Sequence, residues 1–238
     1  DMCVSGGTDY AIRIWKYGAT MNSGKGGFKL MKECFGHAGS ITGLLMVGTM
    51  LWSCSTDMTI RLWDSNSNYE CKYLITQNTE GSATAPVTPT GQQNGQGVGH
   101  KDAVSDLLAF ESQAGKFVLS CSLDGHVKVW NSTNGECLSS TDHGVGLVSM
   151  ALSADAKGNA ILILGSTDGR IFFRCILQSP KTPQPMAFLA VVDGCFAECG
   201  HTSKKAIKSI KTGPSGTFYT VSDDGKLCVW QISDFNLN

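Results

Sequence analysis

The chain has 238 residues, of which 42% are hydrophobic and 28 are glycine, and its 19 lysines and arginines nearly balance 20 aspartates and glutamates. This length allows a sizeable core, whereas the near-zero net charge excludes a global field that would draw the protein to nucleic acid or anionic lipid. The sequence shows no run of eighteen apolar residues and no secretory leader, so we expect no membrane span; because its first residue is aspartate, we expect sequence upstream of it.

A segment of about eleven residues recurs five times along the chain. Each copy has an apolar run, a turn that contains aspartate and often glycine, and a second alternating run, which together predict a β-hairpin. The aspartates are spaced by (224 − 9)/4, about 54 residues, which exceeds a propeller blade repeat and indicates insertions. Flexible-loop composition marks residues 77–97, 18–27 and 178–185. The copies occupy residues 4–15, 53–63, 120–130, 164–174 and 220–230, and their aspartates are Asp9, Asp57, Asp124, Asp168 and Asp224.

Further apolar runs flank these hairpins. One precedes the hairpin, as at 40–47 and 103–110, and another follows it, as at 71–76. Four short strands per unit, repeated around an axis, predict an all-β fold made of β-propeller blades, with five blades visible in residues 1–238. A histidine stands 20 to 25 residues before four of the aspartates, namely His37, His100, His143 and His201.

Hydroxyl and indole side chains occur together in this repeat. Serine or threonine stands four residues before the aspartate in every copy that has tryptophan six residues after it, and we expect the two to face each other across the hairpin. Histidine and aspartate can extend this pair into a buried hydrogen-bonded network that ties the strands of a blade together. We predict three such networks: His37, Ser53, Asp57 and Trp63; His100, Ser120, Asp124 and Trp130; and His201, Thr220, Asp224 and Trp230.

The fourth copy departs from this pattern, because Leu164 and Arg174 replace the hydroxyl and the indole. Such a blade cannot close the same network. The interpretation we favour is a degenerate blade with apolar packing, and the alternatives are that Arg174 pairs with Asp168 or points outward.

The Gly-His start, the aspartate turn and the closing LWD (62–64) or VWN (129–131) resemble the WD-repeat family of β-propellers over nearly the whole chain. Residues 142–152 and 207–230 are similar to the last blades of plant proteins that join a CCCH zinc finger to a propeller. The resemblance implies part of a seven-bladed ring, with the first blade incomplete at its start, the fifth incomplete at its end and about two blades upstream. A five-bladed ring closed by a strand supplied elsewhere is the alternative.

Chemical interpretations of the same residues are weaker. A catalytic triad occurs once per active site, whereas this set recurs with each blade, so we expect no enzyme and no catalytic residue. Cys195, Cys199 and His201 form a ligand-like cluster, but three candidates at atypical spacing do not predict a metal site, and we expect no cofactor.

Two groups of residues repeat at fixed positions outside the networks. Arg13, Arg61 and Lys128 stand four residues after their aspartates, which indicates a solvated strand face more than a basic stripe. Cys54 and Cys121 share the position three residues before the aspartate, which indicates free buried thiols and a cytosolic or nuclear location.

The sequence therefore predicts a scaffold that binds other proteins in a larger assembly through loops at the rims of the propeller. An RNA-associated propeller is the alternative, and we expect no small-molecule substrate. The exposed apolar Leu123 is the best single candidate for a contact. The candidates before the turn aspartates are Thr56, Leu123, Thr167 and Asp223, and those after the histidines are Lys101, Asp102, Lys204 and Lys205.

Overall fold

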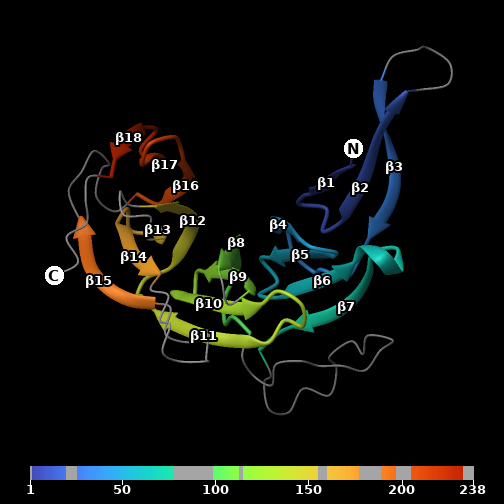
Figure 1. The fold of residues 1–238 in the computed structure, drawn as a ribbon, viewed down its shortest axis with the longest axis horizontal. Helices are drawn as coiled ribbons and strands as arrows, with labels where there is room; N and C mark the ends of the chain where they lie inside the picture. Colours follow the sequence, from blue (N-terminus) through green and yellow to red (C-terminus); the bar gives the residue numbers. More distant parts are fainter. Residues whose placement is uncertain are drawn as a thin grey trace. The chain divides into compact units, whose positions relative to one another are not determined.

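The computed structural model of the chain confirms the all-β prediction: the part it describes consists of five antiparallel β-sheets and one short 3-10 helix, η1 (Ser65–Ser67) (Figure 1). The chain divides into two compact units, Asp1–Leu107 with Ser132–Glu136, and Leu108–Asn131 with Cys137–Asn238. The described residues are 2–19, 26–77, 99–112, 115–154, 160–176, 189–196 and 205–232.

The first unit contains sheets 1 and 2. Sheet 1 has the order β1-β2-β3, and sheet 2 has the order β4-β5-β6-β7. The prediction of a loop over residues 18–27 is wrong at both ends of that stretch, because β2 extends to Ala19 and β3 begins at Gly26. The strands are β1 (Met2–Gly6), β2 (Ile12–Ala19), β3 (Gly26–Cys34), β4 (Ile41–Val47), β5 (Met50–Ser55), β6 (Ile60–Asp64) and β7 (Glu70–Ile75).

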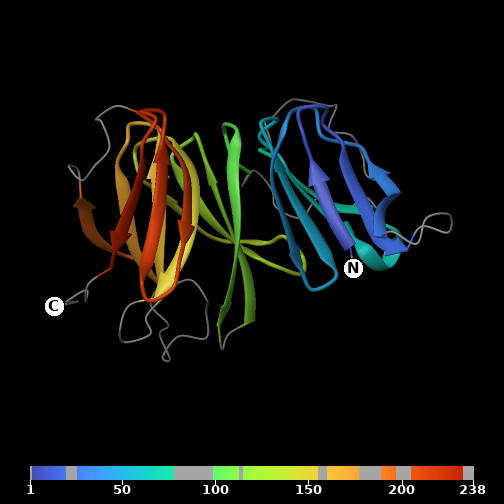
Figure 2. The same ribbon diagram turned by 90° about the horizontal axis from the view of Figure 1, so that it is seen from above.

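The second unit contains sheets 4 and 5 and most of sheet 3. Sheet 3 has the order β11-β10-β9-β8, sheet 4 the order β12-β13-β14-β15 and sheet 5 the order β16-β17-β18. Figure 2 shows the strands of sheet 5, in red, lying side by side. The strands are β8 (Val104–Ser112), β9 (Gly115–Ser122), β10 (His126–Asn131), β11 (Cys137–Asp142), β12 (Leu147–Ala154), β13 (Ala160–Ser166), β14 (Ile171–Ile176), β15 (Leu189–Phe196), β16 (Ile207–Thr212), β17 (Thr217–Ser222) and β18 (Leu227–Gln231).

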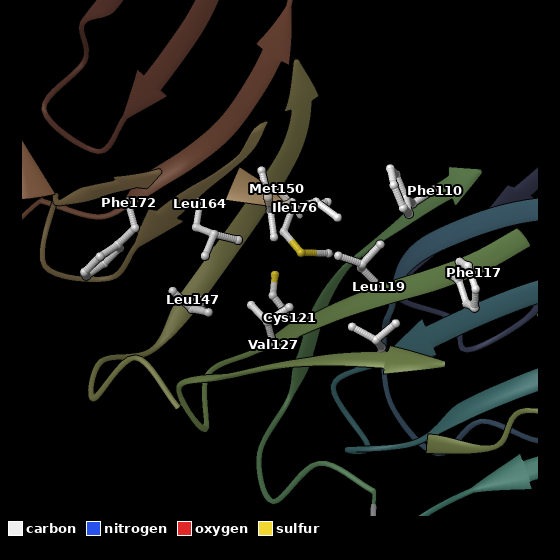
Figure 3. Packing of buried hydrophobic residues seen from close by; sticks show 12 residues of the cluster. Phe110, Phe117, Leu119, Cys121, Val127, Leu147, Met150, Leu164, Phe172 and Ile176 are labelled. Carbon is white, nitrogen blue, oxygen red and sulfur yellow. The ribbon is translucent and has the colours of Figure 1, made fainter. Parts of the chain in front are cut away.

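Sheet 4 is covered on both faces. Successive side chains of a strand point to opposite faces, so Leu162 and Leu164 of β13 pack in one apolar cluster while Ile161 and Ile163 pack in another. All four are at most 2% exposed, which explains why this strand reads as a continuous apolar run instead of an alternating one. Figure 3 shows the first cluster, where side chains of sheets 3 and 4 meet.

The hairpin turns share one backbone conformation. The residue directly after each turn aspartate has a positive φ, between 67° and 88°, which glycine adopts without steric strain. Three copies have glycine at this position, while the other two have Tyr10 and Met58. The frequent Asp-Gly pair in the repeat therefore follows from the left-handed turn.

The position three residues before the turn aspartate sets how closely neighbouring sheets approach. A Cβ added to Gly6 would lie 2.6 Å from Cγ2 of Ile41, and one added to Gly165 would lie 2.6 Å from Cγ2 of Ile207. Glycine thus admits a bulky isoleucine of the next sheet at the same place in both units. In sheets 2 and 3 the position is taken by Cys54 and Cys121, which are free thiols at 0% exposure.

Candidate functional site

Sheet 2 brings His37, Ser53, Asp57 and Trp63 into one hydrogen-bonded chain. The indole Nε1 of Trp63 donates to Oγ of Ser53 over 2.9 Å, and that hydroxyl lies 2.8 Å from Nε2 of His37. The other ring nitrogen of His37, Nδ1, lies 2.9 Å from Oδ2 of Asp57. Because a carboxylate only accepts, Nδ1 carries the proton and Nε2 accepts from the serine hydroxyl. Each of the four side chains therefore has a hydrogen-bond partner, and His37, Ser53 and Trp63 are buried.

Asp57 is also held by its own turn. Its Oδ1 accepts the hydroxyl of Thr59 at 2.7 Å and the Thr59 amide at 2.9 Å, and its Oδ2 accepts the Ala38 amide at 2.8 Å. Partial burial by itself raises the pKa of Asp57, but the hydrogen bonds from His37, Thr59 and Ala38 outweigh burial and hold the pKa well below its ordinary value. Asp57 is therefore a fixed anion that joins the turn to the histidine loop.

The hydroxyl and indole pair recurs in four sheets. The register places Trp63 opposite Leu51, so the expectation that Ser53 and Trp63 face each other directly across the hairpin is wrong. Ser53 is still the partner of the indole, and the bond between them runs diagonally across the hairpin. Serine or threonine points to the same face as tryptophan, two positions along the neighbouring strand. The donor-to-acceptor distances are 2.8 Å for Trp15 to Ser5, 2.9 Å for Trp63 to Ser53, 2.8 Å for Trp130 to Ser120 and 2.7 Å for Trp230 to Thr220.

The structure describes some of the residues of the two other predicted networks, in sheets 3 and 5. His100 is buried at 1% exposure, and Asp124 accepts the amide of His126 at 2.9 Å within its turn. Asp224 likewise accepts the amide of Lys226 at 2.9 Å. His201 lies outside the described residues. By analogy with His37 in sheet 2, we propose that the residues of these two sets form the same kind of network.

Arg174 of sheet 4 is buried beside His143, a position that neither alternative predicted for it. It neither pairs with Asp168 nor points outward: it is 7% exposed, and its Nε donates to Nε2 of His143 at 3.2 Å. Its guanidinium carbon also lies 5.5 Å from the centre of the Phe172 ring. Asp168 instead accepts both Nε and Nη2 of Arg170 at 2.7 Å.

The arginine fixes the protonation state of this histidine. A guanidinium has no acceptor, so Nε2 of His143 must be the acceptor and the imidazole is neutral. Burial, followed by the positive charge of Arg174, lowers the pKa of His143 to about 4. In sheet 4 the arginine therefore bonds to the histidine directly, whereas in sheet 2 the indole reaches the histidine through a serine hydroxyl.

The basic residues four positions after the aspartates do not form a solvated face. Arg61 is 8% exposed, and its Nη2 donates to the carbonyl of Gly36 at 2.7 Å. Lys128 is 9% exposed and donates to Oγ of Ser140 at 3.2 Å. Arg13, which is partly exposed, pairs with acidic side chains of its own sheet. The position shares a face with the tryptophan two residues later, so the sequence period alone could have placed it inside.

The candidate contact residues lie on turns with a shared construction. The amide before the aspartate donates to a carbonyl of the loop that precedes the inner strand, as from Thr56 to Ser40 at 3.0 Å, and in the second unit from Thr167 to Gly146 at 2.8 Å and from Asp223 to Ala206 at 3.0 Å. This bond holds the turn and the loop together as one surface. The exposed candidates are Thr56, Lys101, Asp102, Leu123, Thr167, Lys205 and Asp223, whereas Lys204 lies outside the described residues.

Two of these candidates are neighbours in the second unit. A Cβ placed on Gly146 would lie 3.1 Å from the carbonyl oxygen of Leu123 and 3.1 Å from Cγ2 of Thr167. The Leu123 side chain is 39% exposed. We call the surface formed by Leu123, Gly146 and Thr167 the Leu123 patch. Asp223 differs from them because it forms an exposed ion pair with Lys208 at 3.1 Å.

The described residues contain no group of three or more histidine, cysteine, aspartate or glutamate side chains that could hold a metal ion. The cluster considered at Cys195, Cys199 and His201 lies outside the side chains that the structure describes. In the same part of the chain, no helix is long and apolar enough to cross a bilayer.

Comparison with known proteins agrees with this geometry. The family model of the WD domain, G-beta repeat, matches residues 28–64, 91–131 and 194–231. These residues therefore form WD repeats, and the sheets that contain them are blades of the β-propeller type. A crystal structure of the computationally designed Ika8 protein shares the fold, with a TM-score of 0.58 and 24% identity over 97% of this chain and 55% of that one.

Several curated proteins are similar to parts of the chain. The zinc finger CCCH domain-containing protein 62 of Arabidopsis thaliana is 38% identical over 28% of this chain and 15% of its own length. The striatin homolog of Dictyostelium discoideum is 27% identical over 71% of this chain and 21% of its own length. The nuclear distribution protein nudF of Aspergillus niger is 25% identical over 58% of this chain and 25% of its own length. The chain thus spans a quarter or less of each relative.

Proposed function

We propose that the protein is a non-enzymatic scaffold that binds another protein through the turn surface, with Leu123 as the central contact. The observation that carries this proposal is an apolar side chain, 39% exposed, on a turn whose backbone is fixed. Oγ of Ser122 accepts the Asp124 amide at 3.0 Å, and the amide of His126 is bound by Asp124. A rigid apolar projection loses little conformational entropy when a partner covers it, so it favours recognition.

The state of the histidine networks supports a role without catalysis. A catalytic serine needs a free base beside it and access to substrate. Ser53 is 0% exposed, its oxygen accepts the Trp63 indole, and both ring nitrogens of His37 already have partners. These side chains are occupied in joining strands. Their chemistry therefore favours a structural role, which leaves the loops for binding.

The WD repeats of the chain support the same proposal. Blades of this kind form a stiff frame, and function in such frames resides in the loops and not in the sheets. We further propose a cytosolic or nuclear location, because the seven cysteines whose side chains are described are all free thiols.

The test begins with affinity purification of the full-length protein from its own cells, with and without nuclease, to identify a protein that binds directly. Binding of that protein is then measured for Leu123→Asp and Thr167→Arg. We expect each to weaken affinity by about tenfold or more at an unchanged melting temperature. Met46→Asp is the control, because Met46 is similarly exposed (44%) on β4 of the other unit. Equal loss of affinity in all three variants would contradict the proposal.

An RNA-associated propeller is the second candidate, because a stretch of the chain is 38% identical to a CCCH zinc finger protein. Affinity for RNA falls steeply as salt rises, in proportion to the number of phosphates that lysine and arginine contact. A protein bound at the Leu123 patch, which is apolar, should show a weak salt dependence. Measurement of the purified complex between about 0.05 and 0.5 M salt distinguishes the two.

A further inference from the structure

The hairpin formed by β2 and β3 carries a narrow ribbon that the networks and the turn surface do not use. We call the described residues 16–19 and 26–32 the arm. Tyr17 pairs with Phe28 and Lys16 pairs with Lys29, so that the apolar and the cationic pair point to opposite faces. Figure 1 shows β2 and β3 continuing together past β1.

One face of the arm is apolar and exposed. Phe28 is 63% exposed, Tyr17 is 46% exposed, and their ring centres lie 5.2 Å apart. Leu30, which pairs with Trp15 on the same face, is 40% exposed. A stripe of three exposed large apolar side chains on a narrow ribbon is more than scattered surface residues, and it indicates a contact surface.

The other face of the arm concentrates positive charge. The described residues 16–19 and 26–32 contain Lys16, Lys29 and Lys32 and no aspartate or glutamate. The whole chain has a net charge of −1, so the other residues sum to −1 − 3 = −4. Lys16 stands directly opposite Lys29, an arrangement that destabilises a hairpin unless a counter-charge lies nearby. The arm is therefore a local cation in a chain that is otherwise acidic.

The arm also has an open edge among the described residues. Sheet 1 has the order β1-β2-β3, so β3 is an edge strand, as β7 and β11 are in sheets 2 and 3. Edge lysines and a β-bulge oppose pairing with another copy of the same edge. β3 has both features, with Lys29 and Lys32 on the strand and a bulge where the register shifts between Ile14 and Trp15. A strand that carries acidic side chains would instead be attracted by these lysines.

We propose that the arm binds an extended acidic segment of a partner protein, which pairs along β3 and alternates acidic with apolar residues. Its carboxylates would lie on the face of Lys16 and Lys29, and its apolar side chains would pack on Tyr17 and Phe28. Main-chain hydrogen bonds supply affinity in such strand addition, and alternate side chains supply specificity. The residues differ from those of the Leu123 patch, so this interaction is independent of the proposed scaffold contact.

Nucleic acid fits these observations less well. Base stacking and phosphate binding would have to act on one face, whereas the arm places its aromatic and cationic side chains on opposite faces. The tilted packing of Tyr17 on Phe28, with 60° between the rings, also leaves no parallel pair between which a base could insert.

The probe is a labelled peptide of about twelve residues, with blocked ends, that alternates glutamate with valine and phenylalanine. It is compared with a peptide in which lysine replaces every glutamate, and with a scrambled acidic peptide of the same composition. Fluorescence anisotropy with the full chain should show that the alternating acidic peptide binds about tenfold or more tightly than either of the others.

Two variants locate the binding. The charge reversal Lys29→Glu with Lys32→Glu should transfer the preference to the basic peptide, and Phe28→Ser should weaken the acidic peptide about fivefold without reversing the preference. Lys211→Glu, on an exposed lysine of β16 in the other unit, is the matched control and should change neither. Melting temperatures of all variants are compared, so that loss of binding is separated from loss of the fold.

Three outcomes would overturn the proposal. The first is equal affinity for acidic and basic peptides. The second is a folded charge-reversal variant that keeps the acidic preference. The third is a wild-type arm that binds single-stranded RNA or anionic vesicles through Lys29 and Lys32 and ignores the acidic peptide. None of these results depends on Leu123, so failure here leaves the scaffold proposal to its own test.

Discussion

Arg174 donates its Nε hydrogen to Nε2 of His143 across 3.2 Å, in the one copy of the repeat whose second strand ends without tryptophan. In sheet 2 the corresponding histidine nitrogen is reached through two residues, Trp63 and Ser53. In sheet 4 the long arginine side chain reaches the histidine directly. Leu164, which is fully buried, takes the position that serine has in sheet 2. The two solutions satisfy one histidine by different means.

The first prediction is a double-mutant cycle that converts one solution into the other. Leu164→Ser alone leaves a cavity and a buried hydroxyl, and we expect it to lower the free energy of unfolding by about 2–4 kcal/mol. Arg174→Trp alone leaves an indole without an acceptor and should be destabilising by about 1–3 kcal/mol. The loss of unfolding free energy in the double variant should be smaller than the sum of the two single losses by at least about 1 kcal/mol. Denaturant unfolding measures all four proteins, and strict additivity would count against the exchange.

The second prediction concerns acid. The pKa of His143 is lowered to about 4 in the folded state, whereas that of a free histidine is about 6.5. Between these values the unfolded chain binds a proton that the folded chain does not, so the free energy of unfolding rises with pH from about 4 to about 6.5. Partial exposure of His143 limits its contribution to roughly 1–2 kcal/mol. In His143→Gln the slope of stability against pH in this window should decrease, and an unchanged slope would show that other groups cause it.

The third prediction compares two turn aspartates. Asp57→Asn removes the anion that holds His37, Thr59 and Ala38, and should lower the free energy of unfolding by about 2–3 kcal/mol. Since the pKa of Asp57 lies below its ordinary value, the wild-type advantage is present above the pKa of the unfolded state, near 4, and is lost as the pH falls below it. The equivalent Asp9, half-exposed and paired with Arg13, is the control. Asp9→Asn should change stability little, and equal effects would refute this distinction.

The fourth prediction concerns the buried guanidinium of Arg61. Its Nη2 donates to the Gly36 carbonyl and its Nη1 to Sγ of Cys71, and its Nε has no partner among the described residues. Because a buried cation without a carboxylate is costly to desolvate, Arg61→Met should remain within about 1 kcal/mol of the wild type or exceed it. Arg61→Ala, which also removes the volume, should lose about 2 kcal/mol or more. Thermal unfolding of both separates charge from packing.

The fold was predictable because its signals are local. The turn aspartate, the left-handed residue after it and the flanking apolar runs define each hairpin, and copies such as 53–63 and 120–130 nearly repeat one another. The pairing of Trp63 with Ser53 could be inferred because the two residue types appear and disappear together. Its diagonal register could not, since covariation within a repeat indicates contact without direction.

The site was harder to predict in sheet 4, where one arginine takes the place of a tryptophan and a serine. Nothing in the spacing of Arg174 indicates that it reaches His143, which lies 31 residues earlier, because this depends on the length of the arginine and on the loss of the serine. Arg61 and Lys128 were misjudged for a related reason. Their charge was taken to indicate exposure to solvent, although the period of the strand places both on the buried face of the tryptophan.

The cysteines beneath the hairpins have a practical consequence. Cys54 lies in the first unit and Cys121 in the second, both fully shielded, and burial raises the pKa of Cys54 to about 12. An alkylating reagent meets neither thiolate while the blades are closed, whereas Cys3 is accessible from outside. The rate at which Cys54 is alkylated therefore reports how often the first unit opens, and the rate for Cys121 reports how often the second unit opens.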